Sequence, residues 1–323
     1  MFTARYEKHG SAPEVFILGD VETPHPGAGQ VRVKIAFSGI NPTDVKSRAG
    51  AVASVINEFQ IPHHDGAGVI DAVGDGVSPE RIGERVWLML AAKGSRYGTA
   101  AEYCIVDSDF ARQLPASVSF ELGATLGVPA VTAAYCLFSD GPIRDTNILI
   151  SGGAGAVGRS AIQLARWALA GSGKVFATVS SESKARIARD AGADVVVDYT
   201  KSDAPAQLRD RGISRIIEVN LAANLELDIE ISESGTKIMS YAADGPDPIL
   251  PRRALMTAGI TIEFMLLYNV VAEKFWKSVE LTEQALAAGA LTMPPTRVLP
   301  LKQTAFAHEL VEAGSAERIL LQI

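Results

Sequence analysis

A glycine-rich turn between an apolar run and an amphipathic segment constrains this chain more than any other feature. The run Ile148-Leu149-Ile150 has strand length, and residues 157–165 carry apolar side chains at helical spacing. Between them, Gly153, Gly155 and Gly158 fit the pattern G-x-G-x-x-G. The first glycine permits a tight turn, the second lets a pyrophosphate approach the backbone, and the third lets the helix pack closely on the sheet. This context predicts dinucleotide binding by residues 153–158, which also include Ala154, Ala156 and Val157.

Short apolar strands alternate with helical stretches from residue 147 to about residue 265. The expected strands are residues 147–151, 174–179, 195–199, 216–219, 237–241 and 261–265, and helices are expected at 183–191 and about 222–231. Such alternation is typical of an α/β domain with a doubly wound parallel sheet. A further helix is expected at residues 271–288.

The beginning of the chain has a different pattern. Residues 31–37 alternate apolar and polar side chains at period two, and further short strands follow between Gly-rich turns. This pattern indicates a small β-rich domain, with a barrel as its candidate form. The tail, residues 319–323, is expected to be a strand that returns to this first domain.

Composition excludes several classes of function. The chain has 323 residues, 47% hydrophobic content and a net charge of −7, so it has enough apolar residues for two cores and no basic surface for nucleic acid. No apolar run reaches the length of a membrane span. Cys104 and Cys136 are too few for a disulfide framework and are expected to be buried thiols. We expect a cytoplasmic protein without nucleic-acid or membrane partners.

The residues after the second expected strand favour NADPH over NADH. In this fold an acidic residue there binds the ribose 2′-hydroxyl of NAD, whereas a neutral site near a cation admits the 2′-phosphate of NADP. Here Ser180 and Ser181 end the strand and Lys184 follows, while Glu182 lies past the expected carboxylate position. Ser181 could equally cap the next helix, and Tyr199 could be a phosphate ligand or a partly buried tyrosine.

Motifs spread over nearly the whole chain carry a family resemblance. They are SGINPTD at residues 38–44, DGAGV at 65–69, GERV at 83–86, GVPAVTA at 127–133, the nucleotide loop, ADVVVDY at 193–199 and AHE at 307–309. Together they resemble the medium-chain dehydrogenase/reductase family, specifically its zinc-independent quinone oxidoreductase (zeta-crystallin-like) branch. The resemblance implies a GroES-like β-rich catalytic domain from both chain ends, residues 1–123 and 265–323. It implies an inserted Rossmann domain, residues 124–264, and a homodimer often formed by pairing the last Rossmann strand.

The resemblance also implies site residues. Asn41 and Thr132 would flank the nicotinamide, with His64 in the same pocket, and the loop residues 153–158 would hold the pyrophosphate. Ser180, Lys184 and Tyr199 would hold the adenosine phosphate, and Ser240 and Tyr241 would lie at a nearby strand end. Three departures from the family bear on these contacts. Ala156 replaces a glycine, Glu317-Arg318 replaces Gly-Lys, and Ala222 stands where relatives can have a cofactor-contacting asparagine, so that Asn220 is a possible substitute.

Zinc-dependent members of the superfamily bind a catalytic zinc through Cys, His and Cys. The resemblance places those positions on Asn41, His64 and Val128, and a catalytic zinc needs three protein ligands. We therefore expect no metal. His63 and His64 are candidate proton donors, but water could serve as well.

The leading hypothesis is an NADPH-dependent quinone oxidoreductase that transfers hydride from the nicotinamide to a quinone. The nearest alternative is an NADPH-dependent reductase of enone or enal C=C bonds. A non-enzymatic alternative is a nucleotide-binding redox sensor.

Overall fold

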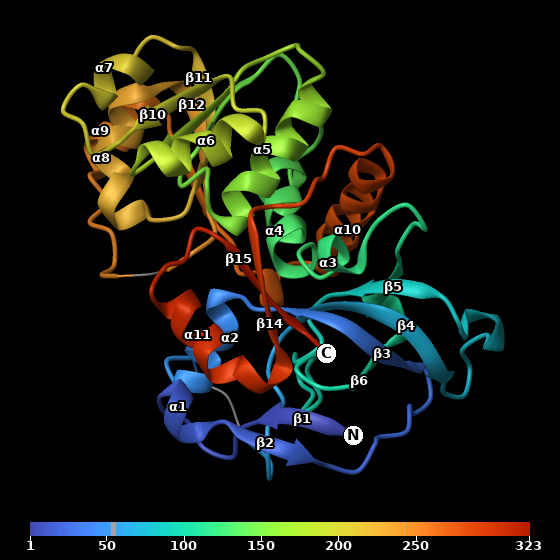
Figure 1. The fold of residues 1–323 in the computed structure, drawn as a ribbon. Coiled ribbons are helices and arrows are strands. Elements are labelled where there is room, and N and C mark those ends of the chain that lie inside the picture. Colours follow the sequence, from blue (N-terminus) through green and yellow to red (C-terminus); the bar gives the residue numbers. More distant parts are fainter. Residues whose placement is uncertain (53–55, 244) are drawn as a thin grey trace. The chain divides into compact units, whose positions relative to one another are not determined.

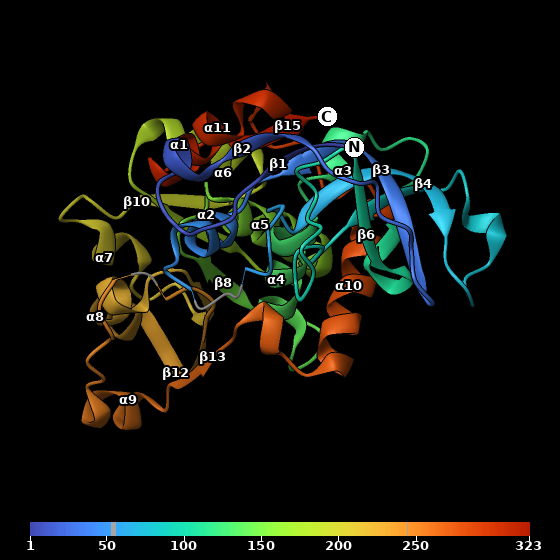
Figure 2. The same ribbon diagram turned by 90° about the horizontal axis from the view of Figure 1, so that it is seen from below.

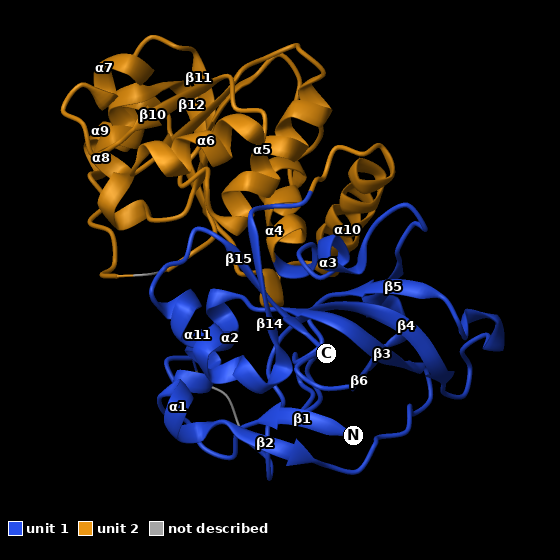
Figure 3. Cartoon of the chain, in the orientation of Figure 1, with its two compact units in different colours: residues 1–128, 293–323 blue, residues 129–292 orange. Residues whose placement is uncertain are grey.

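The computed structural model describes residues 1–52, 56–243 and 245–323. The chain forms two compact units, residues 1–128 with 293–323, and residues 129–292 (Figure 3). The sequence placed the boundaries at 123/124 and 264/265, so both differ. The larger difference has a physical cause: Arg159 and Gln163 of the nucleotide unit hydrogen-bond to Thr292, at distances between 2.7 and 2.9 Å. The helix that ends just before Thr292 therefore belongs with the nucleotide unit.

Residues 129–292 form a doubly wound parallel sheet. Within the described residues it has six strands in the order β10-β9-β8-β11-β12-β13, which is the Rossmann order. The strands are β8 (Asn147–Ile150), β9 (Val175–Val179), β10 (Val195–Asp198), β11 (Ile213–Glu218), β12 (Ser232–Ser240) and β13 (Thr261–Phe264). Each predicted strand of this sheet is confirmed, although β11 and β12 begin several residues earlier than expected.

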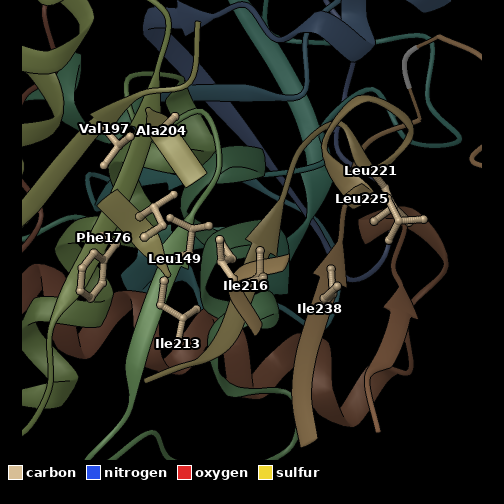
Figure 4. Close-up of a cluster of buried hydrophobic side chains, with 11 residues drawn as sticks. Leu149, Phe176, Val197, Ala204, Ile213, Ile216, Leu221, Leu225 and Ile238 are labelled. Atoms are coloured by element: carbon tan, nitrogen blue, oxygen red, sulfur yellow. The ribbon is translucent and has the colours of Figure 1, made fainter. Parts of the chain in front are cut away.

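Helices cover this sheet and complete its core. They are α4 (Gly127–Phe138), α5 (Ala156–Leu169), α6 (Glu182–Asp190), α7 (Ala204–Leu208), α8 (Leu221–Ile231), α9 (Arg252–Ala258) and α10 (Ala272–Ala287). Helix α5 packs on β8 and β9, whereas α8 packs on β11 and β12. Figure 4 shows one buried cluster, in which Leu149, Phe176 and Ile216 from the strands accompany Leu221 and Leu225 of α8.

The other unit contains a mainly antiparallel sheet. In the part of the chain that the structure describes, seven strands belong to it: β14-β15-β3-β4-β5-β7 in order, with β6 paired to β3. Their bounds are β3 (Gln30–Gly39), β4 (Asp65–Val73), β5 (Arg85–Leu88), β6 (Tyr103–Asp107), β7 (Ala111–Gln113), β14 (Thr296–Pro300) and β15 (Arg318–Gln322). The expected return of the C-terminal strand is confirmed, because Leu320 of β15 pairs with Gly39 of β3.

The two ends of the chain meet in this unit. Strands β1 (Phe2–Arg5) and β2 (Ile17–Asp20) form a separate hairpin, and the helices are α1 (Ala12–Val15), α2 (Pro42–Ala49), α3 (Phe120–Gly123) and α11 (Thr304–Glu312). Helix α11 contacts both α1 and α2, which lie beside it in Figures 1 and 2. Among the helices of the described ranges, none is long and apolar enough to cross a bilayer.

Candidate functional site

The loop between β8 and α5 owes its shape to glycines, which have no side chain. Gly152 has φ +65°, in the left-handed region that favours glycine. A Cβ on Gly153 would lie 2.7 Å from the Cβ of Ala177, and one on Gly158 would lie 2.3 Å from the Gly152 carbonyl oxygen. At Gly155 the nearest atom would be that same oxygen at 3.3 Å, and the residue is exposed. The loop is therefore packed tightly on its inner side and open at Gly155, where a ligand can reach the backbone.

The sequence assigned the tight turn to Gly153, and the structure adds Gly152 to that turn. Gly152 takes the left-handed conformation, whereas Gly153 is required for close packing against β9. Helix α5 begins at Ala156, and its first intrahelical hydrogen bond runs from Arg159 N–H to the Gly155 carbonyl at 2.8 Å. The N–H groups of residues 156–158 come before the first carbonyl-bonded turn of α5, and such N–H groups at a helix N-terminus are suited to bind an anion together with the helix dipole.

The carboxyl ends of β9 and β10 bring Ser180, Lys184 and Tyr199 into one region. Lys184 Nζ donates to Ser180 Oγ at 3.1 Å, and Tyr199 N–H donates to the Val179 carbonyl at 3.0 Å. Ser181 caps α6, accepting from Lys184 N–H at 3.4 Å, so its capping role is observed. The Tyr199 side chain is 49% exposed. The Lys184 ammonium and the Ser180 hydroxyl thus stand together at the end of the second strand, and the Tyr199 backbone is paired with that strand end.

The nearby carboxylates are bound to other partners. Glu182 Oε1 accepts from Arg189 Nη1 at 2.7 Å, and this contact lowers the pKa of Glu182. Asp198 Oδ1 accepts from Thr200 N–H at 3.0 Å and Thr200 Oγ1 at 2.7 Å, which lowers the pKa of Asp198. Both carboxylates are therefore directed to their own local donors. The arrangement suits a 2′-phosphate better than a 2′-hydroxyl that needs a carboxylate acceptor.

The polar residues predicted at the other strand ends have mixed surroundings. Asn220 caps α8, because its Oδ1 accepts from Ala223 N–H at 3.4 Å. Ser240 ends β12 and is 3% exposed, while Tyr241 N–H donates to the Glu218 carbonyl at 3.2 Å. Thr132 lies in α4 and is buried. Contacts between these residues and a nucleotide stay predictions.

In the other unit, Asn41 belongs to a buried polar network. Its Nδ2 donates to Asp65 Oδ2 at 2.8 Å, and its Oδ1 accepts from Arg318 Nη1 at 2.9 Å. Arg318 Nη2 also donates to Asp65 Oδ2 at 3.0 Å, and Val128 N–H donates to Asp65 Oδ1 at 2.7 Å. Burial raises the pKa of Asp65 to about 6, and Arg318 opposes that rise. Asp44 accepts from Asn41 N–H, and burial raises the pKa of Asp44 to about 8.

The two adjacent histidines have different environments. His63 Nδ1 is 2.8 Å from Ser38 Oγ, and its Nε2 is 2.8 Å from His308 Nε2. It is fully buried, so the structure gives no support to His63 as a proton donor. His64 is 8% exposed, and its Nε2 lies 4.0 Å from Asp44 Oδ1. Burial lowers the pKa of His64 to about 4, so this imidazole is neutral at pH 7.

A catalytic zinc does not fit the residues at its expected positions. The Asn41 amide is bound to Asp65 and Arg318, and Val128 contributes only a backbone N–H to Asp65. Within residues 1–52, 56–243 and 245–323, no group of three or more His, Cys, Asp or Glu side chains could hold a metal ion. His64 therefore lacks the two further ligands that zinc requires.

Two buried acid groups and their partners were not predicted from the sequence. Asp65 was part of a matched motif, but its contact with Arg318 joins residues far apart in the chain. Glu218 is fully buried at the end of β11 and accepts from Asn224 Nδ2 at 2.9 Å. A charged residue directly after Ile216-Ile217 was the available signal for Glu218, and the Glu317-Arg318 departure was the signal for Arg318.

Comparison with known proteins identifies the family. Residues 27–116 match the alcohol dehydrogenase GroES-like domain, and residues 156–284 match the zinc-binding dehydrogenase family. The quinone oxidoreductase of Sus scrofa is 30% identical over 314 residues, covering 96% of this chain and 93% of its own. The chain belongs to the medium-chain dehydrogenase/reductase family. Members of its quinone oxidoreductase branch are NAD(P)H-dependent oxidoreductases.

Two further comparisons bear on the activity. A mycobacterial protein solved in complex with NADPH superposes with a TM-score of 0.84 at 25% identity, covering 100% of both chains. The chloroplastic NADPH-dependent alkenal/one oxidoreductase of Arabidopsis thaliana is 30% identical over 203 residues. That match covers 61% of this chain and 52% of the plant protein.

Proposed function

We propose that this chain is an NADPH-dependent quinone oxidoreductase that needs no metal. The main observation in favour of NADPH as the cofactor is the Ser180–Lys184 hydrogen bond at the end of β9, with Glu182 and Asp198 bound to other partners. The quinone acceptor is supported by the relatives that match over almost the whole chain. The similar mycobacterial structure with NADPH supports the same nucleotide.

The nucleotide unit would bind the cofactor with both backbone and side chains. The open backbone at Gly155 and the N–H groups of residues 156–158 would hold the pyrophosphate, as the glycine loop of this fold does. Lys184, Ser180 and Tyr199 would hold the 2′-phosphate. Thr132, Ser240 and Tyr241 are proposed for the nicotinamide half, and the roles of Asn41 and His64 at the nicotinamide are carried over from the family resemblance.

The bound nucleotide supplies the hydride, and the chain's own residues position it and exclude water. Because the residues at the zinc positions cannot hold a metal ion that would act as a Lewis acid, substrates that accept hydride readily without one are favoured. Quinones and α,β-unsaturated carbonyls meet this condition. The pKa of His64 is lowered to about 4, so neutral His64 is a poor acid, and we assign the product's proton to water.

One observation favours a second candidate function, the reduction of enone or enal C=C bonds. The plant alkenal/one oxidoreductase is as similar in identity as the quinone oxidoreductase, although over a shorter stretch. Both reactions use the same hydride donor and differ in the shape of the acceptor.

The test is the rate of NADPH oxidation with two classes of acceptor. We expect faster turnover, as kcat/KM, with 1,4-benzoquinone and 9,10-phenanthrenequinone than with 2-alkenals. Inactivity towards both quinones together with good rates on 2-alkenals would reverse the assignment. Inactivity with every acceptor, despite NADPH binding, would favour a nucleotide-binding redox sensor.

We also propose a homodimer that pairs β13 across a twofold axis. In the described part of the chain β13 is an outer strand, bonded to β12 on one side. Phe264 on this strand and Leu266 just after it are 61% and 53% exposed. An exposed apolar strand edge is a template for pairing with another chain.

A further inference from the structure

His63 has a backbone conformation that few side chains adopt. Its φ is +81°, in the left-handed region that favours glycine, and the residue is fully buried. A residue keeps such a conformation only where its surroundings fix it. His63 directly precedes His64, which the family resemblance places at the nicotinamide, and Asp65, which binds Asn41. The contacts that fix His63 therefore also set the backbone from which these two side chains extend.

Four side chains from separate parts of the chain form a continuous series of hydrogen bonds that ends at the Asp65 backbone. Thr99 Oγ1 donates to the Asp65 carbonyl at 2.6 Å. Ser38 Oγ lies 2.7 Å from Thr99 Oγ1 and 2.8 Å from His63 Nδ1. His63 Nε2 in turn lies 2.8 Å from Nε2 of His308, which belongs to α11. All four residues are 0% exposed, so water does not compete for these bonds.

The Asp65 carbonyl determines the direction of every bond in this series. A carbonyl oxygen can only accept, so the single O–H of Thr99 is used there and Thr99 Oγ1 accepts from Ser38. The O–H of Ser38 is then used as well, so Ser38 Oγ accepts from His63 Nδ1–H. Burial lowers the pKa of His63 well below its ordinary value, so its ring is neutral and has one N–H. His63 Nε2 therefore accepts from His308 Nε2–H.

His308 closes the far end of the series. Burial lowers the pKa of His308 to about 3, so its ring has one N–H at neutral pH, and that N–H is on Nε2. Its Nδ1 has no hydrogen-bond partner in the part of the chain that the structure describes. The Phe16 ring packs edge-on against the His308 ring, with centroids 4.8 Å apart. The unpartnered atom is thus a nitrogen without hydrogen, and every N–H and O–H of the four side chains has an acceptor.

We propose that four buried side chains are positioning residues for the nicotinamide pocket: His308, His63, Ser38 and Thr99. The series holds His63 through both ring nitrogens and Asp65 through its carbonyl, and so fixes the backbone of His64 between them. None of the four touches the nucleotide or the acceptor in this account. The inference rests on the proposed function and adds to it the groups that orient His64 and Asp65.

The test uses variants that keep or remove the donor at His308. In His308→Gln the amide nitrogen can take the place of Nε2 and donate to His63, whereas His308→Phe keeps a ring and loses the donor. Ser38→Ala interrupts the series at another link, which covers the case in which His308→Phe does not fold. Val311→Ala is the matched control, because Val311 packs against a core cluster from the same helix and takes no part in the series.

The kinetic readouts are kcat with 9,10-phenanthrenequinone and the Kd for NADPH. We expect His308→Phe and Ser38→Ala to lower kcat about tenfold, in line with the loss of a buried hydrogen-bond partner. Their Kd should stay within about twofold of wild type, because the proposed phosphate ligands belong to the other unit. His308→Gln should keep at least about half of the wild-type kcat, because it keeps the donor.

Val311→Ala should lower the thermal midpoint and leave kcat unchanged. An unchanged kcat in both His308→Phe and Ser38→Ala would overturn the positioning role. An equal loss of kcat in Val311→Ala, or in His308→Gln, would overturn it as well, because the effect would then not depend on the donor.

A second measurement does not depend on the proposed function. In protein labelled with ¹⁵N at its five histidines, the NMR shifts of the ring nitrogens report the tautomer of each ring. Without nucleotide, the proton of His63 should be on Nδ1 and that of His308 on Nε2, and the opposite tautomer at either residue would refute the direction of the series. The ring signals of His64 should shift in His308→Phe and not in His308→Gln.

Unshifted His64 signals in both variants would refute the positioning of His64. If the wild-type protein turns over no acceptor, the proposed function fails, and the His64 signals still decide whether the series positions this side chain.

Discussion

Replacing Arg318 with methionine removes a buried cation while keeping much of its volume. The Arg318 side chain is 5% exposed and that of Asp65 is 0% exposed. Arg318 donates to the Ile40 carbonyl, to Asn41 Oδ1 and to Asp65 Oδ2. Removing one member of a buried ion pair costs about 3–5 kcal/mol, because the remaining charge is left uncompensated. In Arg318→Met, Asp65 keeps the hydrogen bonds from Asn41 and Val128. We therefore expect the free energy of unfolding to fall by about 3 kcal/mol, the lower end of that range.

A second ion pair in the same sheet provides a matched control. Arg32 of β3 bonds Asp71 of β4 through two contacts of 2.9 Å, but their side chains are 17% and 28% exposed. Arg32→Met should therefore cost about 1 kcal/mol or less, as exposed pairs do. The difference between the two arginines isolates the effect of burial.

The assay is urea denaturation of Arg318→Met, Asp65→Asn and the double variant. Each single variant leaves a buried charge without its partner. The losses of unfolding free energy in the two single variants, added together, should therefore exceed the loss in the double variant by about 1–3 kcal/mol. Additivity within about 0.5 kcal/mol, or a loss for Arg318→Met no larger than that for Arg32→Met, would refute the reasoning.

Three further predictions follow from single side chains. Lys184→Ala should raise the Kd for NADPH about tenfold, as loss of a charged partner does, and leave the Kd for NADH unchanged. Both Kd values are measured by fluorescence titration, with Lys174→Ala, at the opposite end of β9, as the control. Equal effects of Lys184→Ala on both nucleotides would contradict the assignment. Burial lowers the pKa of His308 to about 3 from 6.5. Below pH 6.5 the unfolded chain therefore binds a proton at His308 that the folded chain does not, and this difference lowers the stability of the folded state as the pH falls toward 3. Between pH 6 and 4, the unfolding free energy from urea titrations should therefore fall less steeply in His308→Gln than in wild type, by up to about 1.4 kcal/mol per pH unit. Equal slopes of unfolding free energy against pH would refute this. If the proposed dimer forms through β13, Phe264→Glu should convert it to a monomer in sedimentation velocity, and an unchanged sedimentation coefficient would contradict this interface.

Local patterns in the sequence were sufficient to predict the six strands and the glycine loop of the nucleotide unit. Its strands are short apolar runs, and the loop glycines stand between a strand and a helix, so these elements can be recognised from their own residues. The helices α7 and α9 were not predicted. The N-terminal sheet was harder to predict, because its strands pair across long stretches of chain. The return of residues 319–323 to the first domain was predicted, but their pairing with β3 was not.

The missing parts of the prediction are contacts between distant residues. Thr292 hydrogen-bonds to α5, more than 120 positions earlier, and this contact moves the second domain boundary. Arg318 bonds Asp65, 253 positions away. Neither partner can be read from local spacing, and a buried charge in isolation looks like a surface charge in the sequence.

The central claim is that the chain transfers hydride from NADPH to a quinone without a metal. The most direct test measures the rate of NADPH oxidation with 9,10-phenanthrenequinone before and after dialysis against a strong chelator. We predict the same kcat and KM in both samples, with no gain when zinc is added. Loss of the activity on chelation and its return with zinc would contradict the account.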